Sequence, residues 1–197
     1  MIEGHGIVLK TFFTSKCKVA LLDLDHGKIT AVPSNDQICV GALIRYMIAK
    51  RSGSYQISGI EYIALPLALD RNDLFFYHHV LELCYYFIPL DGGPCNLFYV
   101  VRQLSLLNGE YLSYRYKIFF LVRLFLIFGI HSEIPQGQWP SLKQMFATDV
   151  DSIIIEAIDL KTIDEMRGWL HGCLAHHPLL KQFKTLQFLN KIEMERV

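Results

Sequence analysis

The segment 18–24 is the feature of this sequence that most constrains its fold. It has the composition of a strand, and its alternate positions, counted from Val19 or from Ala20, carry aliphatic side chains in both sets. Successive side chains of a strand point to opposite faces, so both faces of this strand are apolar. In a flat sheet with one hydrated face, only one face of each strand would be apolar. The pattern therefore favours a sheet that curls on itself.

Further strand segments surround this one and are joined by turn residues. Asp25-His26-Gly27 predicts a tight hairpin, because glycine readily adopts a positive φ. The five expected strands are residues 2–13, 18–24, 28–32, 38–49 and 55–65. Five strands in so short a segment predict a small barrel, for which the OB-fold is the common five-stranded solution. An SH3-like barrel is the alternative, and the sequence pattern does not separate the two.

The spacing of apolar residues changes after Pro66 from that of strands to that of helices. Leu74, Tyr77, Leu81 and Cys84, for example, fall on one face of a helix. The expected helices are residues 70–87, 94–107, 110–128, 161–175 and 178–195. The sequence therefore predicts an α+β chain, with an N-terminal five-stranded OB-fold barrel over residues 1–66 followed by an all-α helical domain over residues 67–197.

The charge composition limits what the chain can attract at long range. It has 19 Lys and Arg and 19 Asp and Glu residues, so its formal net charge is zero. Residues 1–66 carry 7 basic and 5 acidic residues, and residues 67–197 carry 12 and 14. A nucleic-acid-binding surface therefore has to come from local placement of charge. The small excess of basic residues favours the first part as the half that faces a polyanion.

The sequence predicts a cytoplasmic protein. Its five cysteines form no close pair and are odd in number, which is typical of reduced thiols. The first five residues, Met-Ile-Glu-Gly-His, offer no basic segment before an apolar core, so we expect no secretory signal. The most apolar run, residues 118–130, contains Arg123 and is too short to span a bilayer, so we expect no association with a membrane.

Three segments near the N-terminus resemble the signature of RecO-type recombination mediator proteins. They are Gly6-Ile7-Val8-Leu9-Lys10-Thr11, Ala20-Leu21-Leu22, and His26-Gly27-Lys28-Ile29-Thr30-Ala31-Val32. Residues 121–130 resemble the family's helix that ends at a glycine, and residues 186–191 are similar to its C-terminal helix. The resemblance covers both halves of the chain.

The resemblance implies a function in DNA repair and homologous recombination, in the cytoplasm and associated with the nucleoid. Members of the family bind single- and double-stranded DNA, anneal complementary strands and help to load recombinase. They do so with a RecR-type partner and the C-terminal tail of single-strand binding protein. The resemblance implies neither an enzyme nor a cofactor.

Two segments depart from the family pattern. Residues 130–140 contain no cysteine, whereas many members carry a four-cysteine zinc site there, so we expect no metal site. Residues 33–37 contain no cation, whereas members usually carry a basic loop after the third strand. Together with the zero net charge, these departures favour an alternative function, which is a RecO-fold interaction scaffold with little affinity for DNA.

Binding to DNA needs cations for the phosphates and aromatic faces for the bases. The candidate cations are Lys10, Lys16, Lys18 and Lys28 in the strand region, with Lys50 and Arg51 at the tip of the last hairpin. The candidate stacking groups are Phe12, Phe13, Tyr46, Tyr55 and Tyr62. The alternative interpretation is that the lysines form a hydrated strand face and that the aromatic residues belong to the core.

The helical half contains more aromatic residues than one helix stripe needs. A core shared between barrel and helices is one explanation. The other is a docking groove for the apolar, acidic tail of single-strand binding protein, with Arg102, Arg115 or Arg123 meeting its carboxylates.

Other clusters of reactive residues favour structural roles. The segment 171–177 contains His171, Cys173 and two further histidines, but its spacing matches no common zinc pattern. We interpret the pairs Asp23 with Asp25 and Asp149 with Asp151 as hydrated edges rather than as acid and base. No nucleophile motif is present in the sequence. A metal-dependent hydrolase using the segment 171–177 remains a third hypothesis, which would require bound metal.

Overall fold

The computed structural model describes most of the first 130 residues and a second stretch nearer the end. The described residues are 1–13, 17–34, 38–51, 53–66, 69, 71–93, 96–106, 112–130 and 155–175. The chain divides into two compact units, Met1–Glu110 and Tyr111–Val197. The barrel predicted for residues 1–66 lies in the first unit, which continues through two helices.

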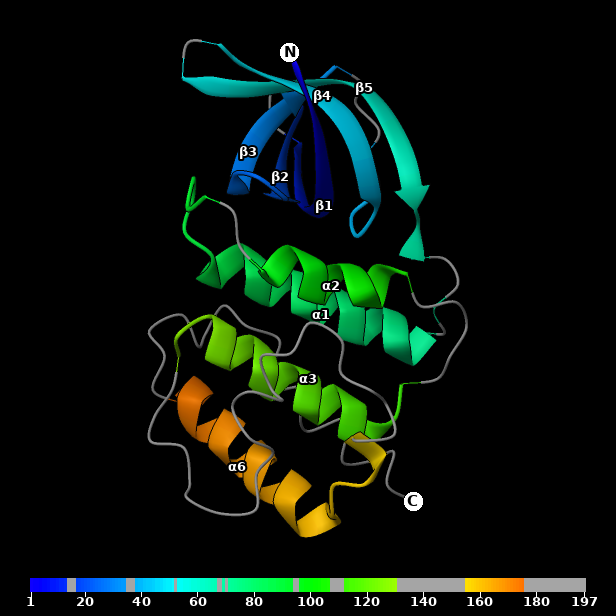
Figure 1. Ribbon diagram of the computed structural model, residues 1–197, viewed down its shortest axis with the longest axis vertical. Coiled ribbons are helices and arrows are strands. Elements are labelled where there is room, and N and C mark those ends of the chain that lie inside the picture. Colours follow the sequence, from blue (N-terminus) through cyan, green and yellow to red (C-terminus); the bar gives the residue numbers. More distant parts are fainter. Residues whose placement is uncertain are drawn as a thin grey trace. The chain divides into compact units, whose positions relative to one another are not determined.

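Five strands form a closed barrel in the order β1-β2-β3-β5-β4 (Figure 1). The strands are β1 (Ile2–Phe13), β2 (Cys17–Asp23), β3 (Gly27–Pro33), β4 (Leu43–Arg51) and β5 (Ser54–Ala64). β1 pairs antiparallel with both β2 and β4, and a parallel pairing of β3 with β5 completes the ring. The predicted five-stranded barrel is therefore confirmed, and its strand order is consistent with an OB-like barrel.

β1 pairs with two neighbours along different parts of its length. Its first half pairs with β4 and its second half with β2. A register shift between Val8 and Lys10 leaves Leu9 as an extra residue, and a β-bulge of this kind bends a strand. The bend allows β1 to follow the curvature of the closed barrel while it pairs with β4 and with β2.

β4 begins at Leu43 rather than at residue 38, where the sequence predicted it. The residues before it form a turn in which the N–H of Gly41 donates to the carbonyl of Val8 at 2.8 Å. The hydroxyl of Tyr77 donates to the carbonyl of Gly41, also at 2.8 Å. Ile38 and Ala42 of this segment are buried in the barrel interior without being in a strand. An apolar run alone therefore did not distinguish the turn from a strand.

The barrel interior is filled by apolar side chains from all five strands and from the turn before β4. They are Val8, Val19, Leu21, Ile29, Ala31, Ile38, Ala42, Ile44, Tyr46, Ile48, Tyr55 and Ile57. The ring of Tyr46 lies directly against β1, at Gly4 and Gly6. A Cβ on either glycine would come within 2.9 Å and 2.8 Å, respectively, of Tyr46 atoms. These two glycines are therefore required by the close approach of the ring.

Asp23 carries a buried carboxylate that ties the β2–β3 hairpin to this interior. Its Oδ1 accepts hydrogen bonds from the N–H groups of Asp25 at 2.9 Å and His26 at 2.8 Å, and lies 2.7 Å from His26 Nδ1. Its Oδ2 accepts a hydrogen bond from the hydroxyl of Tyr46, whose pKa is raised by burial. The predicted hydrated edge is therefore wrong for Asp23, because the turn folds its own backbone donors over the carboxylate.

Two helices of the first unit, α1 (Arg71–Phe87) and α2 (Leu97–Ser105), lie beside the barrel (Figure 1). Both contact β1. Ile7 pairs with Leu22 and with Leu43, and all three are fully or almost fully buried, although they lie outside the interior cluster. Their burial by the helices explains why β2 is apolar on both faces. The curled sheet was predicted correctly, and the second apolar face contacts helices.

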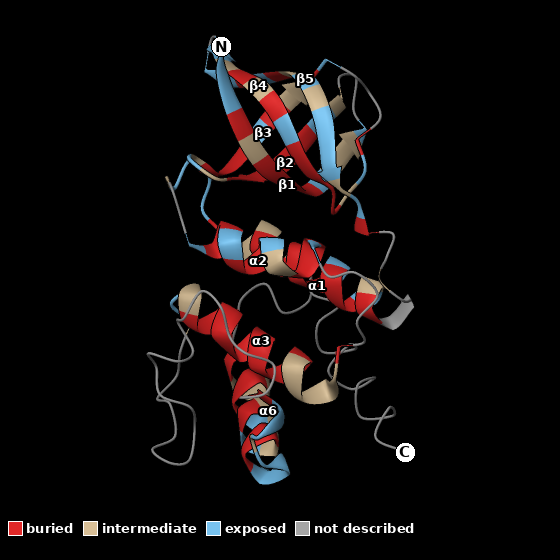
Figure 2. Cartoon of the chain, turned by 45° about the vertical axis from the view of Figure 1, so that its right-hand side comes forward, coloured by how far each residue is buried: buried red, intermediate tan, exposed pale blue. Residues whose placement is uncertain are grey.

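The second unit contains α3 (Tyr114–Ile127) and α6 (Leu160–Ala175), which pack against each other. α3 is buried along most of its length (Figure 2). The hydroxyl of Ser113 caps α3 by accepting the N–H of Tyr116 at 3.2 Å. The predicted helix 178–195 lies outside the described residues. None of the helices in the described part of the chain is long and apolar enough to cross a membrane.

We expect acid to destabilise the first unit in part through His79 of α1. His79 is 5% exposed, and burial lowers its pKa from 6.5 to about 3. Between these values the unfolded chain binds a proton that the folded chain does not, so stability falls as the pH drops from 6.5 toward 3 and is fully retained above 6.5. Glu82 Oε2, 3.9 Å from His79 Nδ1, favours the protonated form and moderates the loss.

Urea unfolding of the wild type and of His79→Gln at about pH 7 and about pH 5 measures this effect. The stability difference between the two pH values should shrink in His79→Gln. His78→Gln is the comparison variant and should shrink the difference less, because His78 is the more exposed neighbour on the same helix although burial lowers its pKa too. An identical pH dependence in the wild type and His79→Gln would contradict the assignment.

Candidate nucleic-acid interface

Two predicted cations and an aromatic side chain share the outer face of the β1–β2 ladder. Lys10 pairs with Ala20, and Phe12 pairs with Lys18. Paired residues and alternate residues of neighbouring strands lie on the same face, so Lys10, Phe12 and Lys18 point the same way. Both lysines are exposed. Ala20 of β2 also pairs with Thr30 of β3, so the exposed side chain of Thr30 lies on the same face.

Aromatic rings from two elements surround the Lys10 ammonium. Its Nζ lies 4.6 Å from the ring centroid of Tyr85, 5.4 Å from that of Phe12 and 6.0 Å from that of Tyr86. Such cation–π contacts hold an ammonium in place without neutralising its charge. Phe13, at the end of β1, is 84% exposed. Tyr85 and Tyr86 were not among the predicted site residues, because they lie in α1 and only the fold brings them to β1.

A second basic group lies at the tip of the β4–β5 hairpin. Lys50 and Arg51 are both exposed. Lys50 pairs with Tyr55, and its Nζ lies 4.8 Å from the centroid of that ring. β3 lies between β2 and β5 in the barrel, so the two basic groups flank β3. Four of the six predicted cations, Lys10, Lys18, Lys50 and Arg51, are therefore exposed on this part of the barrel.

Lys28 is not available in the same way, although it is on β3. Its side chain is 8% exposed, and its Nζ donates to the carbonyl of Tyr85 at 2.6 Å. Burial lowers its pKa. An ammonium held in this way does not reach a phosphate on the surface. The remaining predicted cation, Lys16, lies outside the described residues.

The segment that follows α1 covers the start of β3 and explains the burial of Lys28. The N–H of Asp91 donates to the carbonyl of Lys28 at 2.9 Å, and the N–H of Gly93 donates to that of His26 at 3.2 Å. Gly27, at φ 71°, lies so close that a Cβ would meet the carbonyl oxygen of Gly93 at 2.5 Å. This segment therefore restricts the accessible outer face to the far half of β2 and β3.

The predicted stacking groups divide between the surface and the core. Phe13 and Tyr62 are exposed, and Phe12 is half-buried. Tyr46 and Tyr55 belong to the interior cluster, so neither offers a free face for a base. The core interpretation is therefore the better one for these two residues.

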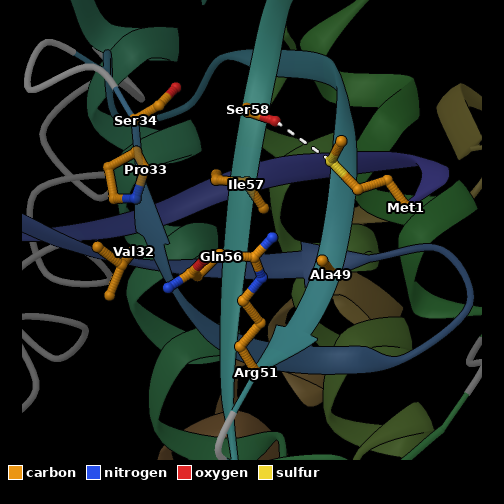
Figure 3. A pocket seen from close by; sticks show the side chains of 9 residues that line it. All are labelled: Met1, Val32, Pro33, Ser34, Ala49, Arg51, Gln56, Ile57 and Ser58. Carbon is orange, nitrogen blue, oxygen red and sulfur yellow. Dashed lines mark hydrogen bonds between the residues drawn. The ribbon is translucent and has the colours of Figure 1, made fainter.

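A pocket of about 320 Å³ lies on the outer face of the barrel where β3 meets β5 (Figure 3). β5 lies in the middle of it, with β3 residues on one side and Ala49 of β4 on the other. The lining residues are Met1, Val32, Pro33, Ser34, Ala49, Arg51, Gln56, Ile57 and Ser58. The sequence analysis named Arg51 as a cation but did not predict a pocket, because its walls come from three strands and the N-terminus.

The acidic side chains of the described barrel differ in their surroundings. Glu61 accepts hydrogen bonds from Arg45, and Glu3 lies 3.9 Å from the same guanidinium. These residues form an ion-pair cluster on β1, β4 and β5, and the hydrogen bond from Glu61 raises the pKa of Arg45. Asp23 is buried. Asp25, in the turn between β2 and β3, is exposed, so this acid lies on the same side of the barrel as β3.

The structure does not bring the three predicted partner-binding arginines together in one unit. Arg102 is exposed on α2 of the first unit. Arg115 of the second unit donates to the backbone carbonyl of Glu156, and its guanidinium lies 3.9 Å from the Glu156 carboxylate. Arg123 is 3% exposed on α3. Arg102 is therefore the one of these three that is placed to meet an external carboxylate.

No group of three or more metal-ligating side chains occurs among the described residues. His171 and Cys173 lie on α6, while the two histidines that follow lie outside the described part of the chain.

The sequence matches no family model, and no curated protein matches it at a significant level. The resemblance to RecO-type proteins therefore rests on segments within residues 6–32, on residues 121–130 and on residues 186–191, which lie outside the described part of the chain, and it stays a prediction.

Proposed function

We propose that this chain binds DNA through its barrel, which we assign to the OB-fold, and that it acts in DNA repair and recombination as a RecO-like mediator. In this role it binds single- and double-stranded DNA, anneals strands and assists recombinase loading with a RecR-type partner and single-strand binding protein. The observation that supports the proposal is the placement of Lys10, Lys18, Lys50 and Arg51, exposed on both sides of β3. Strands 2 and 3 and the flanking loops are where OB-folds hold oligonucleotides.

The chemistry of this surface suits a flexible, negatively charged strand. The four cations would contact phosphates, and Phe12, Phe13 and Tyr85 offer aromatic surface beside them. No bond is made or broken in this function, so it requires no catalytic residue.

For the protein partner, α2 offers a suitable exposed face. Tyr99, Arg102 and Leu106 are exposed at helical spacing, with Tyr99 42% and Leu106 44% exposed. A cation between two apolar side chains matches a peptide that combines apolar residues with a carboxylate, as the tail of single-strand binding protein does. We therefore assign the tail contact to Arg102 rather than to Arg115 or Arg123.

Titration of a fluorescently labelled single strand at two or more salt concentrations tests the proposal. Because each phosphate contact releases counterions, the logarithm of affinity should fall linearly with the logarithm of salt concentration. With four contacts to a single strand, the slope should be about −3. Absence of binding by the full chain at low salt would refute the function.

The environments of Lys18 and Lys28 make a sharper prediction. We expect Lys18→Met to weaken binding and to reduce the salt slope by about 0.7, the value for one phosphate on a single strand. Lys28→Met should leave both quantities unchanged, since that ammonium is bonded to the carbonyl of Tyr85. The two variants change charge equally and differ only in placement. Equal losses in both would contradict the interface drawn here.

The second candidate function is a RecO-fold interaction scaffold with little DNA affinity. The segment after α1 covers Lys28 and the start of β3. It leaves less of the outer face of β2 and β3 accessible to DNA, which favours the scaffold function. A scaffold would bind its protein partners equally well after the exposed barrel cations are reversed. A DNA-dependent mediator would lose its activity in strand annealing.

A further inference from the structure

The pocket between β3 and β5 combines apolar walls with a few polar groups. Val32, Pro33, Ala49 and Ile57 supply apolar surface. Gln56 supplies an amide that both donates and accepts, and Ser34 supplies a hydroxyl that does the same. The hydroxyl of Ser58 donates to Met1 Sδ at 3.8 Å and keeps its capacity to accept. Figure 3 shows Gln56 and Ser58 on the central strand, with Ser34 at the β3 side. This mixture is typical of a ligand site in which apolar walls contact the ligand and a few polar groups fix its orientation.

The size and charge of the pocket further restrict the class of ligand that it can bind. A volume of about 320 Å³ is at the small end of ligand pockets, which run from about 300 to 1,000 Å³. It accommodates one ring system and not a helix. Arg51 brings a positive charge, and none of its nine lining residues is acidic. A flat ring that is attached to an anion fits these properties.

The pocket is continuous with the basic surface of the barrel. Val32 pairs with Gln56, and Gln56 pairs with Ala49, so the pocket crosses three strands. Val19 of β2 pairs with Ala31 of β3. Lys18, the residue before Val19, therefore lies beside Val32, the residue after Ala31. Lys18 and Arg51 therefore lie on opposite sides of the pocket along the same outer face. A strand whose phosphates contact both cations would pass directly over it.

We propose that this pocket receives one unstacked base of a DNA single strand, with the Gln56 amide bonded to the base edge and Arg51 contacting an adjacent phosphate. The inference rests on the proposed DNA-binding function and adds a preference to it. Bases of a duplex are stacked and paired, so they do not enter such a pocket without first being extruded. The chain should therefore bind single strands more tightly than duplexes of equal length.

The test compares short oligothymidylate with a fully abasic strand of equal length, which has the same phosphates and no bases. The wild type should prefer the oligothymidylate roughly tenfold, about the contribution of one net hydrogen bond to a base edge. Ala49→Leu fills the pocket and should lower the ratio by several-fold without changing the salt slope. Ala64→Leu is the matched control, because Ala64 is a half-buried alanine at the far end of β5.

Gln56→Ala, a truncation on an exposed position, provides a second variant that does not depend on fitting extra volume into the barrel. It should lower the preference by several-fold. An unchanged preference in both folded variants, or equal affinity of the wild type for single strand and duplex, would overturn the inference while leaving DNA binding intact. If the wild type binds neither oligonucleotide at low salt, the proposed function itself fails.

Discussion

Replacing Asp23 with alanine is expected to lower the free energy of unfolding by about 3 kcal/mol or more. The carboxylate is fully buried and accepts from two backbone N–H groups, from the hydroxyl of Tyr46 and from the His26 ring. Hydrogen bonds to a charged acceptor contribute about 1.5 to 3 kcal/mol each, and a buried donor left unbonded costs about 1 to 3 kcal/mol. The Tyr46 hydroxyl is the donor with least access to water, so its loss of a partner dominates.

Urea unfolding followed by circular dichroism measures the change. Asp25→Ala is the matched control, since Asp25 lies two residues away and its side chain is exposed, so its effect should stay within about 0.5 kcal/mol. Tyr46→Phe should cost less than Asp23→Ala, because the carboxylate keeps its remaining donors. Equal stability of Asp23→Ala and Asp25→Ala would show that the network does not stabilise the barrel.

The same region shows how far the sequence predicts the fold. The two-sided apolar pattern of β2 and the turn residues after it predicted the curled sheet and its hairpin correctly. Both are local properties, set by alternation and by the φ that Gly27 adopts. The role of Asp23 was missed, because its most buried partner, Tyr46, is distant in sequence. Gly4 and Gly6 are explained by that same ring, which no local pattern indicates.

The sequence predicted the candidate site, like the fold, only where local features determine it. Lys18 and Lys28 both lie in strands beside apolar residues, and nothing in the sequence distinguishes an exposed ammonium from a buried one. The difference arises from the segment after α1, which covers Lys28 and leaves Lys18 open. Lys50 and Arg51 were predicted at a hairpin tip, a local feature, and they are exposed there. The pocket beside them depends on the parallel pairing of β3 with β5, which a strand pattern does not reveal.

Neutral net charge and DNA binding are compatible only if opposite charges are kept apart on the surface. In the described barrel this condition is met in part. Arg45 is paired with Glu61 and Glu3, and Asp23 is enclosed by its own donors. Asp25 in the β2–β3 turn and Asp91 beside Lys28 are exposed, so they lower the positive potential at that end of β3. The local potential, rather than the net charge, decides the affinity.

Reversing the four exposed cations together, as Lys10→Glu, Lys18→Glu, Lys50→Glu and Arg51→Glu, should therefore have the largest effect on binding. We expect the salt slope for a single strand to fall by about 3 and the low-salt affinity to fall by roughly a hundredfold or more. All four side chains are exposed, so the melting temperature should fall only by the loss of the cation–π contacts of Lys10 and Lys50, which contribute about 0.5 to 1 kcal/mol each at exposed sites. Lys18→Glu and Lys161→Glu form a matched pair, since both alter the net charge by two and Lys161 is exposed on α6. Equal losses in that pair would mean that overall charge governs binding, and the barrel face would then have no special role.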